Sequence, residues 1–285
     1  MLVATLLFVS LDTTAKFLSA TYPVEQVVWA RFTFHFVFVL GLIAPQGWPG
    51  LRTARPGLQL LRSAFMLGAN GFFFYGLRSL PLVTASAVVF VGPLLVAALS
   101  VPLLGEKVGP RRWAAIAVGF GGAMVIIQPG PGMFESAAIW PLCAAISFSF
   151  YQICTRVLAR YDAPLTTLLY TAVVGTVASS IVVPAVWVAP DMKGWLLMGT
   201  AGMFGALGQL ALIKAIGAAP VSTVAPFSYT GLLWASAFGF LAFGDIPAIN
   251  TLVGASIIAA SGLYVLHREQ AIRKLAARDQ SKVNG

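Results

Sequence analysis

Long apolar stretches alternate with short polar or Pro/Gly-rich segments along the whole chain. A helix needs about 20 mostly apolar residues to cross the hydrocarbon core of a bilayer, and ten stretches meet this requirement. Their predicted bounds are 1–20, 24–44, 58–79, 82–104, 110–128, 135–157, 164–187, 194–217, 220–243 and 248–267. The connections between them are short and carry turn-forming residues such as Leu80-Pro81 and Ala219-Pro220. The pattern predicts an all-α integral membrane protein with ten transmembrane helices.

Composition agrees with this class. Of the 285 residues, 59% are hydrophobic and only 9% are charged, whereas about 25% are charged in a soluble domain. The net charge of +9 does not indicate nucleic-acid binding, because that function needs basic residues gathered on a solvated face. The two cysteines, Cys143 and Cys154, share one apolar stretch, and we expect them to pack as small core residues and not to form a disulfide.

Lysine and arginine are unequally divided between the two predicted sides of the membrane. An even number of spans places both termini on one side, and that side holds fourteen basic residues against two, Arg78 and Lys193, on the other. The fourteen are Arg52, Arg55, Arg62, Lys107, Arg111, Arg112, Arg156, Arg160, Lys214, Arg268, Arg273, Lys274, Arg278 and Lys282. Because basic loops stay cytoplasmic, we predict a multi-pass protein of the cytoplasmic (inner) membrane with both termini cytoplasmic. Anionic lipid headgroups account for the basic excess without a nucleic-acid partner.

The chain contains a weak internal repeat. A shift of 139 positions places residues 81–127 on 220–266 without a gap. The matched positions are Pro81 and Pro220, Thr84 and Thr223, Gly92 and Gly231, Leu94 and Leu233, Ala98 and Ala237, Gly105 and Gly244, with Glu106 on Asp245 and, upstream, Asn70 on Gln209. The span boundaries also coincide, which predicts two five-helix repeats, 1–128 and 135–267, followed by a basic cytoplasmic tail, 268–285.

Five spans per repeat give the second repeat the opposite orientation in the membrane. Many secondary transporters use inverted repeats to build alternating access around a site at the membrane midplane. A receptor or a structural protein has no evident need for this symmetry. The repeat is therefore the strongest functional indication that does not depend on any family.

Several motifs make a family resemblance specific. They are Asp12-Thr-Thr-Ala-Lys16, Trp29-Ala-Arg31-Phe32, Tyr75-Gly-Leu-Arg78-Ser-Leu-Pro81, Leu104-Gly-Glu106, and Thr155-Arg156 through Tyr170-Thr171. With them the chain resembles the EamA-type permeases of the drug/metabolite transporter superfamily over essentially its whole length. The resemblance implies a central cavity between the two halves and transport of small polar metabolites such as amino acids. It also places a glutamate at the end of the fourth span, here Glu106, with Asp245 as its equivalent in the second half.

Three charged residues, Asp12, Lys16 and Arg31, lie within predicted spans. Each costs about 2.5–3.5 kcal/mol at the centre of a membrane helix, so each needs a partner or water. At 1.5 Å per residue, Asp12 and Arg31 lie about 12 Å and about 10 Å from the outer ends of their spans. They can therefore form a structural ion pair, and Lys16 can reach the outer headgroups. The functional alternative is that Arg31, assisted by Lys16, binds a substrate carboxylate.

Other polar and aromatic residues are weaker candidates. His35, four residues after Arg31, is either a carrier of a coupling proton or a packing residue. Asn70 and Gln209 either line the cavity or bridge helices, and Tyr151 replaces Asp12 in the second repeat. The residues proposed for an aromatic cavity wall are Tyr75, Tyr229 and Trp234, and those proposed as gating kinks are Gly92, Pro93 and Pro226. The small residues Gly119, Gly121, Gly122 and Ala123 indicate packing or a homodimer contact.

No motif for catalysis, a metal or a cofactor is present, and no nucleotide-hydrolysing domain. Concentrating transport would therefore draw on an ion gradient, such as a coupling proton, or on an exchange substrate. We predict a secondary transporter for small polar metabolites, amino acids or related carboxylate compounds, with a site formed by the first, second, third, sixth, eighth and ninth spans. The alternatives are a lipid or lipid-linked flippase and a membrane subunit that transports nothing.

Overall fold

The computed structural model describes residues 1–44, 53–105, 109–127, 136–218 and 225–283, and these residues form helices and turns with no strand. In chain order the α-helices are α1 (Leu2–Ser19), α2 (Val24–Ile43), α3 (Pro56–Leu77), α4 (Leu82–Val89), α5 (Gly92–Leu104), α6 (Pro110–Ile127), α7 (Ile139–Leu158), α8 (Pro164–Val182), α9 (Met192–Ala218), α11 (Thr230–Phe243) and α12 (Ile249–Val283). Short 3-10 helices cover Ser136–Ala138, Val183–Val186 and Ala225–Tyr229.

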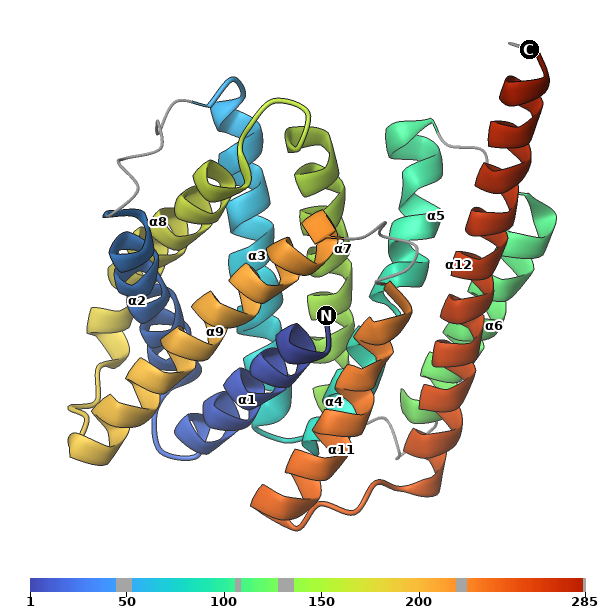
Figure 1. The fold of residues 1–285 in the computed structure, drawn as a ribbon. Coiled ribbons are helices and arrows are strands. Elements are labelled where there is room, and N and C mark those ends of the chain that lie inside the picture. Colours follow the sequence, from blue (N-terminus) through green and yellow to red (C-terminus); the bar gives the residue numbers. More distant parts are fainter. Residues whose placement is uncertain (45–52, 106–108, 128–135, 219–224, 284–285) are drawn as a thin grey trace.

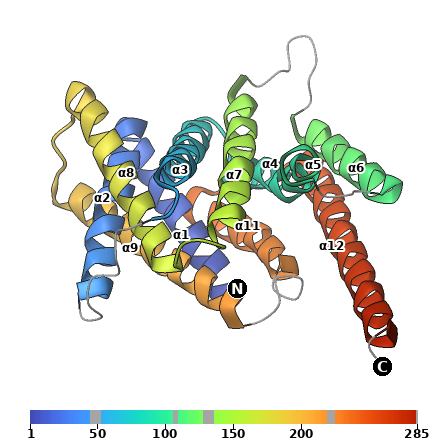
Figure 2. The ribbon, with the colours of Figure 1, turned by 90° about the horizontal axis from the view of Figure 1, so that it is seen from above.

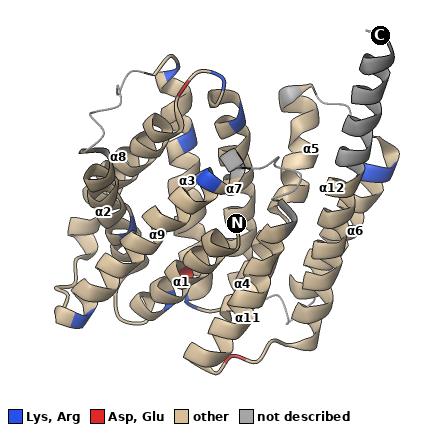
Figure 3. Ribbon diagram, in the orientation of Figure 1, with Lys and Arg blue, Asp and Glu red and all other residues tan. Residues whose placement is uncertain are grey.

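Six helical segments in the described ranges are long and apolar enough to cross a membrane. They are Leu2–Ser19, Leu82–Leu103, Ile139–Leu158, Pro164–Val186, Met192–Leu212 and Ile249–His267. Lys, Arg, Asp and Glu gather mostly toward the ends of the helices, and the ribbon between the ends is largely uncharged (Figure 3). This is the distribution of a multi-pass membrane protein, since a charge in hydrocarbon is costly and a charge at the headgroups is not.

Helices from the two ends of the chain interleave (Figure 1). The helix α3 packs against α7 and α8, α2 packs against α8 and α9, and α1 packs against α9 and α11. The pair formed by α6 and α12 lies at one edge of the molecule, and α2, α8 and α9 lie at the other (Figure 2). Side chains on α1, α2 and α3 that face inward are therefore brought against the second part of the chain.

The fourth predicted span is broken where Gly92-Pro93 predicts a kink. The helix α4 ends at Val89 and α5 begins at Gly92, because a proline in the second helical position cannot donate the hydrogen bond that would continue α4. In the second half, Pro226 lies in the 3-10 helix Ala225–Tyr229 that precedes α11. The first residues of the ninth predicted span, 220–224, lie outside the described residues, and the gating role of these prolines remains a prediction.

Two glycines that the 139-residue shift aligns end their helices in the same way. Gly105 after α5 and Gly244 after α11 both have φ of 68°, a left-handed conformation that costs glycine little and other residues more. Glu106, which follows the first of them, lies outside the described residues. At the end of the chain, α12 continues to Val283. The predicted tail from residue 268 is thus largely helical, as its many Ala, Arg, Lys and Gln residues favour.

Small residues of α6 serve contacts within the chain. A Cβ on Gly122 would lie 2.9 Å from the carbonyl oxygen of Gly254 in α12, and a Cβ on Gly119 would lie 2.1 Å from Leu94 of α5. Nothing lies within 4 Å of the corresponding position on Gly121. The close contact of α6 with α12 therefore depends on Gly122, and its close contact with α5 depends on Gly119.

Loop contacts join the first two helices to the start of α9. The Tyr22 hydroxyl donates to the Asp191 carboxylate at 3.1 Å, and the Gly194 N–H donates to the same oxygen at 2.7 Å. Gln26 exchanges two hydrogen bonds with the backbone of Val188, at 2.8 Å and 2.9 Å. The Gly194 N–H and then the Tyr22 hydroxyl hold the pKa of Asp191 below its ordinary value. Asp191 thus acts as the N-cap of α9.

The contact between α2 and α9 gives a first prediction. A Cβ on Gly202 would lie 2.2 Å from Phe34 Cβ and 2.8 Å from the backbone nitrogen of His35. The nearest atom to a Cβ on Gly199 is at 4.0 Å. We expect Gly202→Ala to lower the free energy of unfolding by about 1–3 kcal/mol through overpacking. Gly199→Ala, on the same helix, is the control and should change it little. Thermal unfolding of the purified proteins in detergent measures both, and equal melting temperatures for the two variants would contradict the close approach.

The cap on α9 gives a second prediction. Because the pKa of Asp191 is lowered in the folded protein, its hydrogen bonds add stability above the unfolded value of about 3.9. This contribution is lost as the pH falls through the lower folded pKa. Asp191→Asn keeps a good capping side chain but cannot titrate, so its melting temperature should fall less than that of the unmodified protein between about pH 6 and about pH 3. Superimposable profiles of melting temperature against pH would show that Asp191 contributes nothing.

Candidate functional site

A network of polar side chains lies where α1, α2, α3, α7, α8 and α9 meet. Its charged members are Asp12 on α1, Arg31 on α2 and Arg62 on α3. Arg31 is 2% exposed and Arg62 is 3% exposed, which is unusual for arginine. The hydroxyl of Tyr151 on α7 accepts a hydrogen bond from Arg62 and interacts electrostatically with Arg31. The network therefore joins the first three helices to the helices of the second part of the chain.

Arg62 is the residue of this network that sequence analysis missed. It was counted among the charges of the terminal side, but it lies within α3 and is buried. Its Nε donates to Thr155 Oγ1 at 2.7 Å and its Nη2 donates to the Tyr151 hydroxyl at 2.7 Å. Its Nη1 donates to the Thr171 hydroxyl at 2.5 Å and to the Thr167 carbonyl at 3.1 Å. One guanidinium thus joins α3, α7 and α8.

A sequence signal for this position existed. The buried residues of α3 include Gln59, Arg62, Ser63 and Met66, which follow one another at helical spacing. A polar stripe at the start of an apolar span indicates a face that meets protein and not lipid. The seventh predicted span, 164–187, was likewise left out of the predicted site, although it forms α8, whose Thr167 and Thr171 accept hydrogen bonds from Arg62.

Tyr151 and Gln209 connect the network to α9. Gln209 Nε2 donates to the Tyr151 hydroxyl at 3.2 Å, and the guanidinium of Arg62 lies 4.4 Å from the centroid of the Tyr151 ring. Both residues were predicted site residues, and they lie together. Asn70, the predicted counterpart of Gln209, instead donates to the carbonyl of Met66 on its own helix at 2.7 Å.

Arg31 has only part of its charge and hydrogen-bonding capacity satisfied. Its charge is attracted by that of Asp12, but no direct ion pair joins these two described side chains. Its guanidinium lies 4.7 Å from the centroid of the Phe32 ring. The buried Nε of Arg31 and both ring nitrogens of His35 have no hydrogen-bond partner among the described residues. Such atoms cost about 1–3 kcal/mol each unless something binds them, so they are candidates for contact with a ligand.

The aromatic candidates divide between two regions. The buried indole nitrogen of Trp234 has no partner within the described part of the chain, and its ring packs against the hydrophobic cluster that contains Tyr151. Tyr229 packs elsewhere, with its ring centroid 5.5 Å from that of Phe90 and its hydroxyl against Gly262 of α12. Tyr75 hydrogen-bonds to Glu25. Trp234 thus packs against the hydrophobic cluster to which Tyr151 belongs, whereas Tyr229 packs with Phe90 and α12.

Lys16, in the last turn of α1, forms an ion pair with Asp245. Its Nζ lies 2.6 Å from Asp245 Oδ2 and 4.5 Å from the centroid of the Phe243 ring. A cavity of about 430 Å³ adjoins this ion pair. Its lining residues are Lys16, Phe17, Ser19, Ala20, Leu77, Arg78 and Phe243. The ion pair joins α1 to the segment after α11, so Lys16 has an acidic partner of its own.

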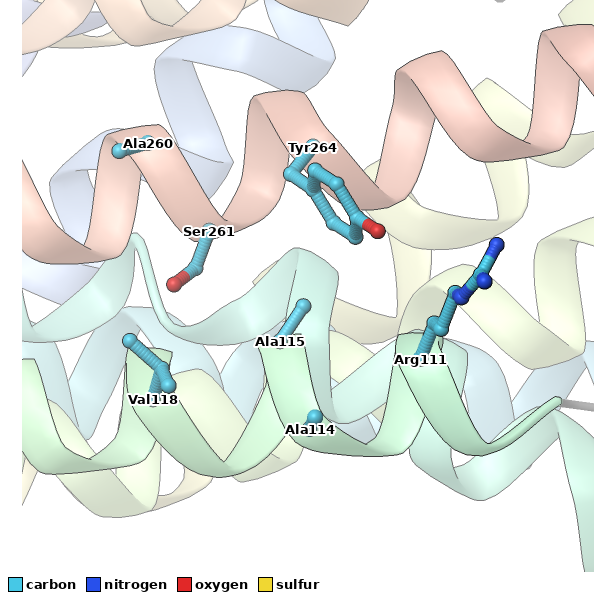
Figure 4. Close-up of a pocket in the computed structure, with 7 residues that line it drawn as sticks. All are labelled: Arg111, Ala114, Ala115, Val118, Ala260, Ser261 and Tyr264. Atoms are coloured by element: carbon cyan, nitrogen blue, oxygen red, sulfur yellow. The ribbon is translucent and has the colours of Figure 1, made fainter.

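A second groove, of about 390 Å³, lies between α6 and α12. Figure 4 shows Arg111 and Tyr264 near one end of it, with alanines and Ser261 along its length. The α6–α12 pair lies at the edge of the molecule away from α2, α8 and α9 (Figure 2). This groove is therefore separate from the network that contains Arg31.

Known proteins resemble the chain along almost its entire length. The EamA-like transporter family model matches residues 1–128 and 135–266. An S-adenosylmethionine uptake transporter of Rickettsia prowazekii (strain Madrid E) is 27% identical over 271 residues, 95% of this chain and 92% of the relative. A riboflavin transporter of Vibrio cholerae serotype O1 (strain ATCC 39315 / El Tor Inaba N16961) is 30% identical over 274 residues, 94% of this chain and 92% of the relative.

A solved crystal structure aligns with a TM-score of 0.59 over 95% of this chain and 98% of the other, at 19% identity. At this identity the similarity concerns the fold alone. The two named relatives are transporters and not enzymes. Two matches to one family model, together covering almost the whole chain, show that the protein belongs to the EamA-like transporter family, within the drug/metabolite transporter superfamily.

Proposed function

We propose that the protein is a secondary transporter for small metabolites that carry a carboxylate, with amino-acid-like compounds as its main class. The observation that carries this proposal is Arg31. It is buried where helices of both halves meet, and its Nε has no partner among the described residues. A guanidinium binds a carboxylate through paired, charge-assisted hydrogen bonds. A substrate carboxylate would supply both the missing acceptor and the missing negative charge.

The substrates named for the relatives differ in whether they carry an amino acid group. S-adenosylmethionine, named for one relative, has an α-amino acid group, whereas riboflavin, named for another, has no carboxylate. Both are small polar compounds with a planar ring system. The buried Arg31, whose Nε has no partner among the described residues, favours the first kind of substrate. Trp234, whose ring packs against the hydrophobic cluster that contains Tyr151, offers a surface for an aromatic or aliphatic part of the substrate.

For the mechanism we propose alternating access between two inverted five-helix repeats, 1–128 and 135–267. Two observations support the repeats: the family model matches each half separately, and the aligned residues Gly105 and Gly244 end their helices with the same φ. The excess of basic residues supports cytoplasmic termini in the inner membrane. Transport would use an ion gradient or exchange, and His35 is the candidate carrier of a coupling proton.

Counterflow in proteoliposomes tests the proposal. Liposomes loaded with a pooled metabolite extract are incubated with an isotope-labelled copy of the extract, and mass spectrometry reads which compounds exchange. We expect exchange of carboxylate-bearing compounds, with a loss of at least about tenfold in Arg31→Ala because a hydrogen bond to a charged group is removed. The control is Arg111→Ala, which removes an equal charge from the exposed face of α6 and should exchange normally.

Two outcomes would contradict the proposal. Exchange confined to compounds without a carboxylate would exclude the substrate class while leaving transport in place. Normal exchange of carboxylates by Arg31→Ala would remove Arg31 from the binding site. Gel filtration in detergent distinguishes a loss of exchange from a loss of folded protein.

A further inference from the structure

Positive charge exceeds negative charge at the centre of the helix network. Nine acidic residues occur in the sequence, and the side chains of five of them, Asp12, Glu25, Asp162, Asp191 and Asp245, are described. Asp12 interacts with Arg31. Each of the other four has its own partners: Tyr75 for Glu25, Thr53 and Gln59 for Asp162, Tyr22 for Asp191, and Lys16 for Asp245. No described carboxylate is therefore paired with Arg62.

The hydrogen bonds of Arg62 go to neutral groups alone within the described residues. One N–H at Nε, two at Nη1 and one at Nη2 are used, and a guanidinium has five. One N–H at Nη2 remains. A buried cation without a counter-charge is costly, and neutral hydrogen bonds offset only part of that cost.

The Tyr151 hydroxyl is also incompletely used. It accepts hydrogen bonds from Arg62 and from Gln209, and its own proton has no acceptor in the described part of the chain. The free N–H at Nη2 and the hydroxyl proton belong to groups 2.7 Å apart. Two neighbouring donors beside an uncompensated positive charge form a site for an anionic oxygen.

We propose that Arg62 and Tyr151 form a second binding site for the carboxylate of the transported compound, the Arg62–Tyr151 site, which receives it from Arg31. This inference rests on the proposed function, because it assigns a second position to the same substrate group. The helix α2, which carries Arg31, packs against α3 and α8, which hold Arg62 and two of its hydrogen-bond partners, and Arg31 interacts electrostatically with Tyr151, so both sites belong to one helix network. The carboxylate would move from one guanidinium to the other as the two halves rock. It would stay beside a positively charged group throughout this movement.

The position of Arg62 decides which side of the membrane the second site serves. Arg62 lies near the start of α3, Thr155 near the end of α7 and Thr167 near the start of α8, and these three helix ends lie on the same side of the bundle (Figure 1). This is the side predicted to be cytoplasmic. Arg31, by contrast, lies in the first half of α2, which starts on the opposite side. The Arg62–Tyr151 site would therefore hold substrate when the protein opens to the cytoplasm.

Sided transport measurements test the second site. Right-side-out and inside-out membrane vesicles are prepared from cells that make the protein, with vesicles from cells lacking it as background. The probe is the isotope-labelled metabolite extract, diluted in steps to give an apparent affinity from each side. For Arg62→Gln we expect at least about a tenfold weaker affinity for carboxylate compounds on the cytoplasmic side, and a change of less than about twofold on the other side.

Two further variants separate binding from support of the helices. Tyr151→Phe keeps the ring beside the guanidinium and removes the hydroxyl, so it should weaken binding on the cytoplasmic side with little effect on the melting temperature. Because this variant preserves packing, the affinities measured with it from the two sides also test the proposal if Arg62→Gln does not fold. The control Arg111→Gln makes the same substitution on the exposed face of α6 and should leave both affinities unchanged.

The outcomes distinguish this inference from the proposed function. Exchange by the unmodified protein, with Arg62→Gln or Tyr151→Phe weakened equally from both sides or unchanged, would overturn the Arg62–Tyr151 site and leave the transporter assignment intact. Absence of exchange of any carboxylate compound by the unmodified, folded protein would overturn both. Weakening on the cytoplasmic side alone is the result that supports the second site.

Discussion

The hydrogen bonds of Arg62 are the interaction on which the centre of the molecule depends. One guanidinium binds side chains or backbone of α7 and α8 from its place on α3. In a bilayer these donors cannot turn to bulk water, so the helices that satisfy them must stay close together. The contact also crosses between the two halves of the chain. Any motion of one half against the other must exchange these hydrogen bonds for others.

The ends of the bundle are held differently. On the side of the turn between α1 and α2, polar contacts run from Tyr22 and Gln26 to the segment before α9, and from Lys16 to Asp245. These contacts lie near the ends of helices, where exchange with water makes them weaker than buried ones. A structure with firm hydrogen bonds around the buried Arg62 and weaker contacts at one end is suited to opening at that end. This division agrees with transport and gives a packed structural subunit no advantage.

The network also explains why unpaired polar atoms persist in an apolar protein. Packing alone would favour replacing Arg31 and His35 with apolar residues, since their buried nitrogens lack partners in the described part of the chain. Polar groups that are costly in the unliganded protein become favourable when a ligand satisfies them. Trp234 and Tyr229 each have a buried polar atom without a described partner as well, but Trp234 packs against the cluster that contains Tyr151, whereas Tyr229 packs against Gly262.

Membrane class and family could be predicted from the sequence. The hydrocarbon core of the bilayer requires long apolar segments with few charges, and both properties are visible in the sequence itself. Asp12, Arg31, Tyr151 and Gln209 were identified in the same way, as polar residues inside apolar spans. Arg62 was not, because a basic residue near the start of a span has the same sequence pattern whether it meets headgroups or protein. Only the packing of α3 against α7 and α8 decided between them. Only the tertiary structure showed that Lys16 pairs with Asp245, that Tyr229 packs against α12 and that Asn70 hydrogen-bonds within its own helix. Helical spacing defines the face on which a residue lies, but not the neighbour that this face meets.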